Sequence, residues 1–156
     1  MFQGELIGIY LAPEKAGPMA ARDAAPAVAG QGLDGDRYFH RRGTFTKRDD
    51  PDRPDRQVTL IEAEALEAAA ADGAALTPEQ SRRNLLTRGV PLNHLVGREF
   101  TVGEVRLRGL RLCEPCGHLE KLSVKDARAR LIHRGGLRAE ILSGGTLKKG
   151  DPIRPA

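Results

Sequence analysis

Residues 82–116, RRNLLTRGVPLNHLVGREFTVGEVRLRGLRLCEPC, carry the pattern from which the fold is predicted. Residues 84–89 have the composition of a short strand, and residues 91–97 favour one or two helical turns. Between residues 99 and 112 apolar side chains alternate, imperfectly, around the turn VGE at residues 102–104, which predicts a β-hairpin. Short strands joined by tight turns, with helices interspersed, indicate a β-rich α+β fold built as an antiparallel or mixed β-barrel.

The flanking sequences add further strands. Residues 5–11 (ELIGIYL) and 57–62 (QVTLIE) are short apolar runs with β-branched residues, as expected for strands. Residues 137–155 predict a second hairpin, with its turn at residues 144–145, and another turn at residues 150–151. The strict alternation of strands and helices that is typical of a doubly wound sheet is absent from the sequence.

Three segments predict helices. Residues 62–73 (EAEALEAAAADG) combine helix-favouring residues with a final glycine, which can end a helix in the left-handed conformation. Residues 77–80 (TPEQ) match a capping box with proline at the first helical position, so a short helix is expected there. Residues 123–136 (SVKDARARLIHRGG) predict an amphipathic helix with Ser123 as its N-cap and Gly135 at its end.

A long region without clear periodicity separates the first two predicted strands. Residues 12–57 are rich in Gly, Pro, Asp and Arg, and a loop of this length inside a compact domain is usually functional or disordered. We expect part of it to be ordered, with residues 36–40 (DRYFH) as a candidate strand. Residues 46–57 (TKRDDPDRPDRQ) are the best candidate for a mobile lid.

The composition is that of a soluble globular protein. The chain has 156 residues, 40% hydrophobic and 29% charged, which predicts a single domain spanning residues 1–156. Two cysteines are too few for a secreted disulfide scaffold, and no apolar run is long enough for a membrane helix. The N-terminus lacks the pattern of a signal peptide, so we expect a cytoplasmic protein without membrane association.

The charge favours small anionic ligands over nucleic acids. The net charge is +4, but the aromatic fraction is only 4%, and Trp is absent. Proteins that bind single-stranded nucleic acid by stacking usually present aromatic platforms, so nucleic acid is not an expected partner. A small phosphate-bearing ligand suits this composition, although the same excess charge is also compatible with an ordinary solvated surface.

The stretch CEPCGH at residues 113–118 contains the only two cysteines and is compatible with several chemistries. A structural zinc site needs four nitrogen or sulfur ligands, of which the two cysteines supply half, and His118 and His133 could complete it. A redox dithiol usually lies at a helix N-terminus, whereas proline and glycine here indicate a turn. A haem attachment motif is disfavoured, because glycine separates the second cysteine from the histidine.

Two further interpretations of the cysteines remain. Both thiols could be buried as small hydrophobic side chains, but turn residues usually lie near the surface. Alternatively, Cys116 alone could present a thiolate to a soft transition metal, because thiolates are suitable ligands for such ions. The dipeptide Pro115-Cys116 does not establish that role by itself.

Three separated blocks together resemble one family. These are GLDGDRYFHR (residues 32–41), the stretch 82–116 quoted above, and HRGGLRAEILSGGTLKKGD (residues 133–151). Their order and intervals resemble those of the MOSC domain, a family related to the C-terminal part of molybdenum cofactor sulfurases. The resemblance covers most of the chain, from residue 32 to residue 151.

The resemblance implies a β-barrel that holds a molybdopterin-type molybdenum cofactor or handles its sulfur. The family's cysteine falls on Cys116, which would ligate molybdenum or carry sulfur. Cys113 does not match that position, although disulfide or persulfide exchange with Cys116 stays open. The other residues that match the family's motifs are Gly35, Asp36, Arg37, Arg83, Asn84, Arg134, Gly135 and Gly136.

The chemistry of these residues is compatible with an anionic pterin. Arg83 would offer a planar fork for bidentate contact with phosphate, and Asn84 offers both a donor and an acceptor for a pterin edge. The matching glycines would allow the backbone to approach the ligand closely. We expect Arg37 and Arg134 to bind the cofactor as well, and Asp36 to be the proton donor.

The resemblance leads to one principal functional hypothesis and two alternatives. The principal one is a molybdenum-dependent reductase of N-hydroxylated or similar N-oxygenated small molecules, with electrons from a separate donor protein. The first alternative is a carrier of sulfur or cofactor that interacts with a cofactor-biosynthesis protein and has no turnover of its own. The second is a zinc or dithiol module that uses both cysteines. No pyridoxal phosphate is expected in this chain.

Overall fold

The computed structural model of the protein describes residues 1–40 and 53–156. The strands are β1 (Gly4–Leu11), β2 (Ala20–Arg22), β3 (Ala24–Val28), β4 (Gly32–Leu33), β5 (Val58–Glu62), β6 (Leu85–Arg88), β7 (Glu99–Val102), β8 (Val105–Leu112), β9 (Leu137–Ser143), β10 (Gly145–Lys148) and β11 (Pro152–Pro155). The α-helices are α1 (Ala63–Ala71), α2 (Pro78–Ser81), α3 (Gly117–Lys121) and α4 (Ala127–Arg130), and the 3₁₀ helices are η1 (Pro54–Arg56) and η2 (Leu92–Leu95).

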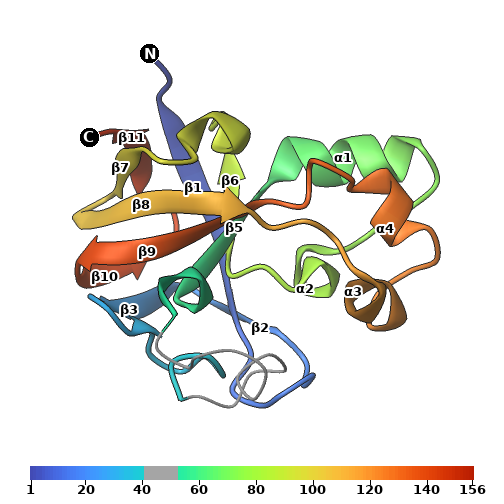
Figure 1. Cartoon of the computed structure of the whole chain (residues 1–156), viewed down its shortest axis with the longest axis horizontal. Coiled ribbons are helices and arrows are strands. Elements are labelled where there is room, and N and C mark those ends of the chain that lie inside the picture. The colour runs from blue at the N-terminus through green and yellow to red at the C-terminus, as the bar shows by residue number, and fades with distance from the viewer. Residues whose placement is uncertain (41–52) are drawn as a thin grey trace.

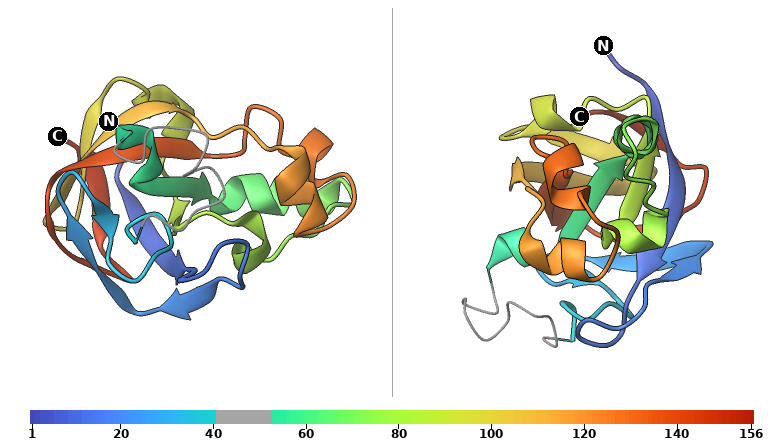
Figure 2. Two further views of the ribbon diagram at one scale, coloured as in Figure 1. Left: turned by 60° about the horizontal axis from the view of Figure 1, so that its bottom comes forward. Right: turned by 90° about the vertical axis from the view of Figure 1, so that its right-hand side faces the viewer.

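Seven strands form a closed, mixed barrel. Their order is β11-β7-β8-β9-β5-β6-β1, and pairing of β1 with β11 closes the ring, while β2 continues the sheet beyond β1. Neighbouring strands are antiparallel except β5 and β6, which run parallel. This arrangement confirms the predicted β-rich α+β barrel. Figure 1 shows the barrel with all four α-helices gathered on one side of it, and Figure 2 shows the same grouping from two other directions.

The hairpin predicted over residues 99–112 and the first two predicted helices are confirmed. Strands β7 and β8 pair in register from Glu99 opposite Arg108 to Val102 opposite Val105. Helices α1 and α2 lie in the crossover between the parallel strands β5 and β6. The capping box at the start of α2 is formed, since Thr77 and Gln80 exchange hydrogen bonds of 2.9 and 3.2 Å.

The prediction of a hairpin with its turn at residues 144–145 is wrong. Strand β10 pairs with β3, not with β9, and belongs to a separate three-stranded sheet of order β10-β3-β4. The reason lies in the barrel, because both edges of β9 are already occupied by β8 and β5. The chain after β9 must therefore find another partner, and the unpaired edge of β3 provides it.

Three other expectations about local structure are corrected. Residues 36–40 form a turn instead of a strand, stabilised by the Asp36 carboxylate, which accepts a hydrogen bond from the Tyr38 N–H at 3.4 Å. The helix predicted over residues 123–136 is reduced to α4, because Asp126 and His133 adopt positive φ angles of 67° and 60°. Cys116 lies directly before helix α3, where only a turn was expected. Of the predicted lid, residues 46–52 lie outside the described residues and residues 54–56 form η1.

Two hydrophobic clusters hold these elements together. One fills the barrel, with Leu6, Leu60, Phe100 and Leu107 fully buried. The other contains Leu66, Leu86, Leu119 and Leu131, and it packs α1, α3 and α4 against the outside of the barrel. Burial of apolar side chains on both faces of the barrel wall fixes the helices relative to the strand ends. Among residues 1–40 and 53–156, no helix has the length and apolarity to cross a membrane.

Candidate functional site

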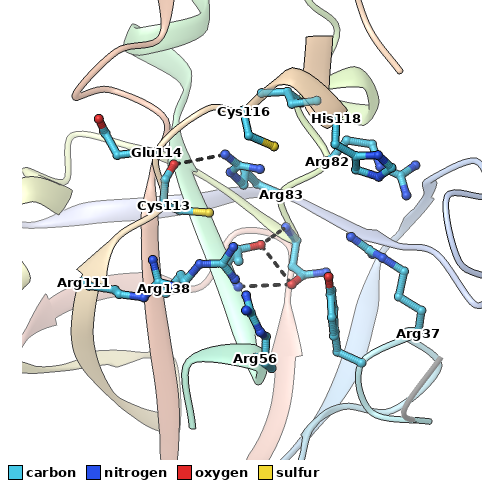
Figure 3. A pocket seen from close by; sticks show the side chains of 14 residues that line it. Arg37, Arg56, Arg82, Arg83, Arg111, Cys113, Glu114, Cys116, His118 and Arg138 are labelled. Atoms are coloured by element: carbon cyan, nitrogen blue, oxygen red, sulfur yellow. Dashed lines mark hydrogen bonds between the residues drawn. The ribbon is translucent and has the colours of Figure 1, made fainter. Parts of the chain in front are cut away.

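A cavity of about 230 Å³ lies where the ends of β5, β6, β8 and β9 meet helix α3 (Figure 3). Among the described residues that line it, six are arginines and one is a carboxylate, so the charge of the wall is strongly positive. The lining residues are Arg37, Tyr38, Arg56, Thr59, Arg82, Arg83, Asn84, Arg111, Cys113, Glu114, Cys116, His118, Leu119 and Arg138.

Four arginines lie around the buried residue Asp55, and three of them line the cavity. Nε of Arg111 donates a hydrogen bond of 2.9 Å to Oδ2 of Asp55, and Nη1 of Arg138 donates one of 3.2 Å to the carbonyl oxygen of Asp55. Burial alone would raise the pKa of Asp55, but the hydrogen bond from Arg111 and the nearby charges of Arg56, Arg111 and Arg53 lower it below its ordinary value. Arg53, Arg56, Arg111, Arg138 and Asp55 are called the Asp55 cluster below.

The register of the barrel places two of these cations opposite each other. Arg111 on β8 is the direct cross-strand partner of Arg138 on β9. Like charges at such positions are destabilising, and the ion pair of Arg111 with Asp55 offsets part of the repulsion. Nε of Arg138 is buried without a hydrogen-bond partner among the described residues. Oδ1 of Asp55 is likewise buried and has no partner among them. Burial, which dominates, and the neighbouring arginines lower the pKa of Arg138.

A second pair of arginines lies on another side of the cavity. Figure 3 shows Arg37 and Arg82 across the cavity from Arg56, Arg111 and Arg138, with His118 beside Arg82. Nη1 of Arg37 contacts Oδ1 of Asp36 at 3.2 Å, and its guanidinium carbon lies 4.8 Å from the centre of the Tyr38 ring. Burial, followed by the charge of Arg37, lowers the pKa of Arg82 to about 10, so Arg82 remains a cation at neutral pH.

Arg83 is buried, and its side chain donates hydrogen bonds mainly to backbone carbonyl oxygens. Its guanidinium donates hydrogen bonds to the carbonyl oxygens of Gly135 at 2.7 Å, Cys113 at 3.0 Å and Ser81 at 3.3 Å. Three of its five N–H groups are therefore engaged within the protein. Arg83 lines the cavity, but its clearest role is to join three segments of the cavity wall.

Asn84 is likewise engaged within the barrel. Its amide oxygen accepts hydrogen bonds of 3.1 Å from the N–H and from the hydroxyl of Thr59, and its amide nitrogen donates one of 3.1 Å to the carbonyl oxygen of Tyr10. Asn84 therefore connects β1, β5 and β6 beneath the cavity. The acceptor that was expected to recognise a pterin edge already has two protein donors.

The two cysteines differ in exposure. Cys113 is 1% exposed, whereas Cys116 is half-buried, and both line the cavity as free thiols. Figure 3 shows the Cys116 side chain directed toward the space between the two groups of arginines.

The other residues expected from the sequence are divided between the wall and its surroundings. Asp36 is 1% exposed, and its carboxylate accepts hydrogen bonds from the N–H groups of Ala12 and Tyr38 and from Arg37. Neither Asp36 nor Gly35 is among the described residues that line the cavity. Arg134 is exposed and also lies outside the lining.

Gly135 supports the cavity through its backbone. A Cβ atom at this position would lie 2.3 Å from the carbonyl oxygen of Cys113 and 2.9 Å from Cδ of Pro115. Only glycine allows this close approach of the chain before β9 to the segment that carries the cysteines. Gly135 thus positions Cys113, while its own carbonyl oxygen accepts the hydrogen bond from Arg83.

Four arginines of the cavity were not identified from the sequence: Arg56, Arg82, Arg111 and Arg138. Arg111 and Arg138 belong to strands that are separated by helices and turns, so their pairing depends on the barrel register. A signal for Arg111 was present, since it breaks the apolar alternation of β8 just before Cys113. Arg82 was adjacent to a recognised motif but had no signal of its own.

The donor set for a zinc site is incomplete within the described part of the chain. Among residues 1–40 and 53–156, no group of three or more His, Cys, Asp or Glu side chains is arranged to hold a metal ion. His133 forms an ion pair with Glu114, with 3.2 Å between Nδ1 and Oε2, and is mostly exposed. A tetrahedral site built on Cys113 and Cys116 therefore lacks the further ligands that it needs.

Comparison with known proteins gives a family and a fold. The MOSC domain model matches residues 43–154, which is most of the chain. The structure resembles that of the YuaD protein from Bacillus subtilis, with a TM-score of 0.79 and 18% identity over 98% of this chain and 97% of that one. It also resembles YiiM from Escherichia coli, with a TM-score of 0.67 and 17% identity over 100% of this chain and 70% of that one. No curated protein matches the sequence.

Proposed function

The chain belongs to the MOSC domain family, and we propose that it binds a molybdopterin-type molybdenum cofactor in the arginine-lined cavity, with Cys116 as a ligand of molybdenum. The family is generally associated with this cofactor. The observation that carries the proposal is the position of Cys116, a half-buried thiol in a cavity walled by six arginines. Thiolate suits a soft metal, and arginine suits the phosphate of a pterin.

The Asp55 cluster fits the phosphate of such a cofactor. Its four arginines and one carboxylate leave a net charge of about +3, most of which a phosphate dianion would neutralise. The buried Nε of Arg138, which has no acceptor among the described residues, would gain one. Arg111 and Arg138, which repel each other across the β8–β9 pair, would share an anion between them.

The residues that were expected to bind the cofactor take different roles in this proposal. Arg83 and Gly135 hold the wall that carries the cysteines, and Asn84 fixes the strands beneath it. In this proposal Asp36 holds the guanidinium of Arg37 and is not assigned the proton transfer, since it is not among the described residues that line the cavity. Arg134 is exposed, is not among the described residues that line the cavity, and has no role in this proposal.

When bound, the molybdenum group would supply two-electron oxygen-atom chemistry, and we propose reduction of N-hydroxylated or similar N-oxygenated small molecules as the reaction class. The chain would contribute the thiolate of Cys116 and the cations that bind anionic groups. Electrons would come from a separate donor protein. A carrier of cofactor or sulfur remains the alternative, with Cys116 as the loaded residue.

The proposal is tested by producing the protein in a host that makes the cofactor and in one that cannot. Molybdenum, pterin and phosphate are then measured per chain, and the intact mass of the protein is recorded. Near-stoichiometric molybdenum and pterin in the first preparation, with turnover when electrons are supplied, supports the reductase. Bound cofactor without turnover, or a labile extra sulfur on Cys116, supports the carrier. Neither metal nor pterin in the first preparation would rule out both cofactor roles.

A further inference from the structure

The cations of the cavity form two groups, and only one of them is needed to hold a cofactor phosphate. The first is the Asp55 cluster. The second consists of Arg37 and Arg82, called the Arg82 pair below, on another side of the cavity (Figure 3). The charges that act on Arg82 come from Arg37, Asp36, Tyr38 and Arg83, and those on Arg138 come from Cys113, Arg56, Arg83 and Arg111. Only Arg83 acts on both, so the two groups share little of their charged surroundings.

Arg82 has a backbone conformation that is unusual for its residue type. It is the residue at which α2 ends, and its φ and ψ angles are 65° and 16°. Helices often end in this left-handed conformation, but glycine or asparagine usually occupies the position because other side chains are strained there. Residues kept in strained conformations cluster at functional sites. Here the strained backbone directs an arginine side chain into the cavity wall.

Contacts within the protein hold both side chains of the Arg82 pair and use only some of their N–H donors. Nη1 of Arg82 donates a hydrogen bond to the carbonyl oxygen of Gly17. Nη1 of Arg37 is engaged with Asp36 and lies 3.6 Å from the sulfur of Met19. These contacts fix the two guanidinium groups, each of which has five N–H donors in a planar fork. A fork of this kind matches the two oxygens of a carboxylate.

The charges of the two groups differ. Two arginines and the Asp36 carboxylate give the Arg82 pair a net charge of about +1, compared with about +3 for the Asp55 cluster. A singly charged anion therefore neutralises the Arg82 pair, whereas the larger excess of the Asp55 cluster suits a doubly charged phosphate. The pair also adjoins α3, which begins directly after Cys116, and a charge interaction with Arg82 and Arg37 reaches His118 on that helix. A ligand on the pair would thus lie beside the thiol.

We infer that the Arg82 pair is the binding site for the anionic group of the substrate, and that the substrates are small molecules carrying a carboxylate. That the anion belongs to a substrate rests on the proposed function, whereas the anion site itself does not depend on molybdenum. The inference also changes the role of Arg37, which was predicted from the sequence to bind the cofactor and is here assigned to the substrate. Arg82 becomes the residue that determines specificity.

The test uses two anions as probes on the purified, cofactor-free chain: benzoate for the carboxylate and inorganic phosphate for the cofactor. Isothermal titration calorimetry measures the binding of each anion alone and in the presence of the other. We expect both to bind together, with little competition. Arg82→Gly and Arg37→Gln should each weaken benzoate by about tenfold and phosphate by less than about twofold, since a charged hydrogen bond contributes on this scale. Arg138→Gln should instead weaken phosphate by about tenfold and benzoate by less than about twofold.

Two controls separate a lost contact from a lost fold. Glycine tolerates the backbone conformation at position 82, so Arg82→Gly should keep the midpoint of thermal unfolding close to that of the unmodified protein. Arg154→Gln replaces an exposed arginine on β11 outside the cavity and should leave both affinities unchanged. Benzoate that fails to bind, that competes fully with phosphate, or that binds Arg82→Gly as well as the unmodified chain overturns the inference.

The outcome is independent of the proposed cofactor. If phosphate fails to bind while benzoate binds through Arg82, the proposed cofactor site is weakened and the carboxylate site stands. In cofactor-loaded protein, the matched readout compares an N-hydroxylated substrate that carries a carboxylate with its neutral analogue. Arg82→Gly should raise KM for the carboxylated compound by a much larger factor than it raises KM for the neutral one. Equal effects on both compounds contradict the inference.

Discussion

Nε of Arg83 donates a hydrogen bond of 2.7 Å to the carbonyl oxygen of Gly135, across 52 residues of sequence. The same guanidinium reaches the carbonyl oxygen of Cys113 at 3.0 Å and that of Ser81 at 3.3 Å. One buried cation thus joins the end of α2, the end of β8 and the start of β9. The position of the cysteine segment relative to the other arginines depends on this connection.

Replacing Arg83 by lysine should lower the free energy of unfolding by about 2 kcal/mol, although the charge is retained. A lysine ammonium cannot contact three carbonyl oxygens that lie in the directions of a planar guanidinium, so buried acceptors lose their donors. Urea unfolding measures the change, with Arg154→Lys, on the exposed face of β11, as the matched control. If the two lysine variants unfold at the same urea concentration, Arg83 does not have this structural role.

Gly135→Ala should also destabilise the protein, by about 2 kcal/mol or more, because a Cβ atom would lie 2.3 Å from the carbonyl oxygen of Cys113. Gly117→Ala, only a few residues beyond Cys113, is the control. No described atom lies within 4 Å of a Cβ at position 117, so this change should be neutral or stabilise by up to about 1 kcal/mol. Thermal unfolding of the two variants compares them directly, and equal midpoints would refute the close approach at Gly135.

The stability contributed by Asp55 should depend on pH. Its pKa is lower in the folded protein than its ordinary value, despite burial, because Arg111, Arg56 and Arg53 stabilise the carboxylate. A carboxyl group with a depressed folded-state pKa contributes stability that is complete above the unfolded-state pKa and disappears as pH falls through the folded-state pKa. Asp55→Asn should therefore lower the free energy of unfolding by about 1–2 kcal/mol at pH 7, and by much less at pH 3.

Urea unfolding at these two pH values measures the effect, with Asp23→Asn at an exposed position as the control. The control should show a small difference at both values. A penalty for Asp55→Asn that is the same at pH 3 and at pH 7 would show that the carboxylate charge is not what stabilises the cluster.

The fold was predictable from the sequence where local chemistry decides it. The β7–β8 hairpin, the capping box at Thr77 and the helix before Gly73 follow from turn, capping and helix propensities. The partner of β10 was not predictable, because it depends on β9 having both edges occupied in a closed barrel. The short α4 was missed for a related reason. Tertiary hydrogen bonds from His133 to Glu114 and from Arg128 to Glu120 override the local helical preference.

The site was only partly predictable from the sequence. Motif resemblance led to Cys116 and Arg83, and both line the cavity. Motifs do not show whether a side chain faces the ligand or the backbone, and the engagement of Arg83 and Asn84 within the protein emerges only from their contacts. The Arg111–Arg138 pair arises from strand register between segments far apart in the chain. Such pairs cannot be inferred before the strand order is known.

The central claim, that Cys116 and not Cys113 supplies sulfur to molybdenum, is tested most directly by X-ray absorption at the molybdenum edge of cofactor-loaded protein. Cys116→Ala should lose molybdenum, or lose one sulfur neighbour from it, whereas Cys113→Ala should match the unmodified protein. The same loss in both variants, or a loss confined to Cys113→Ala, would contradict the account.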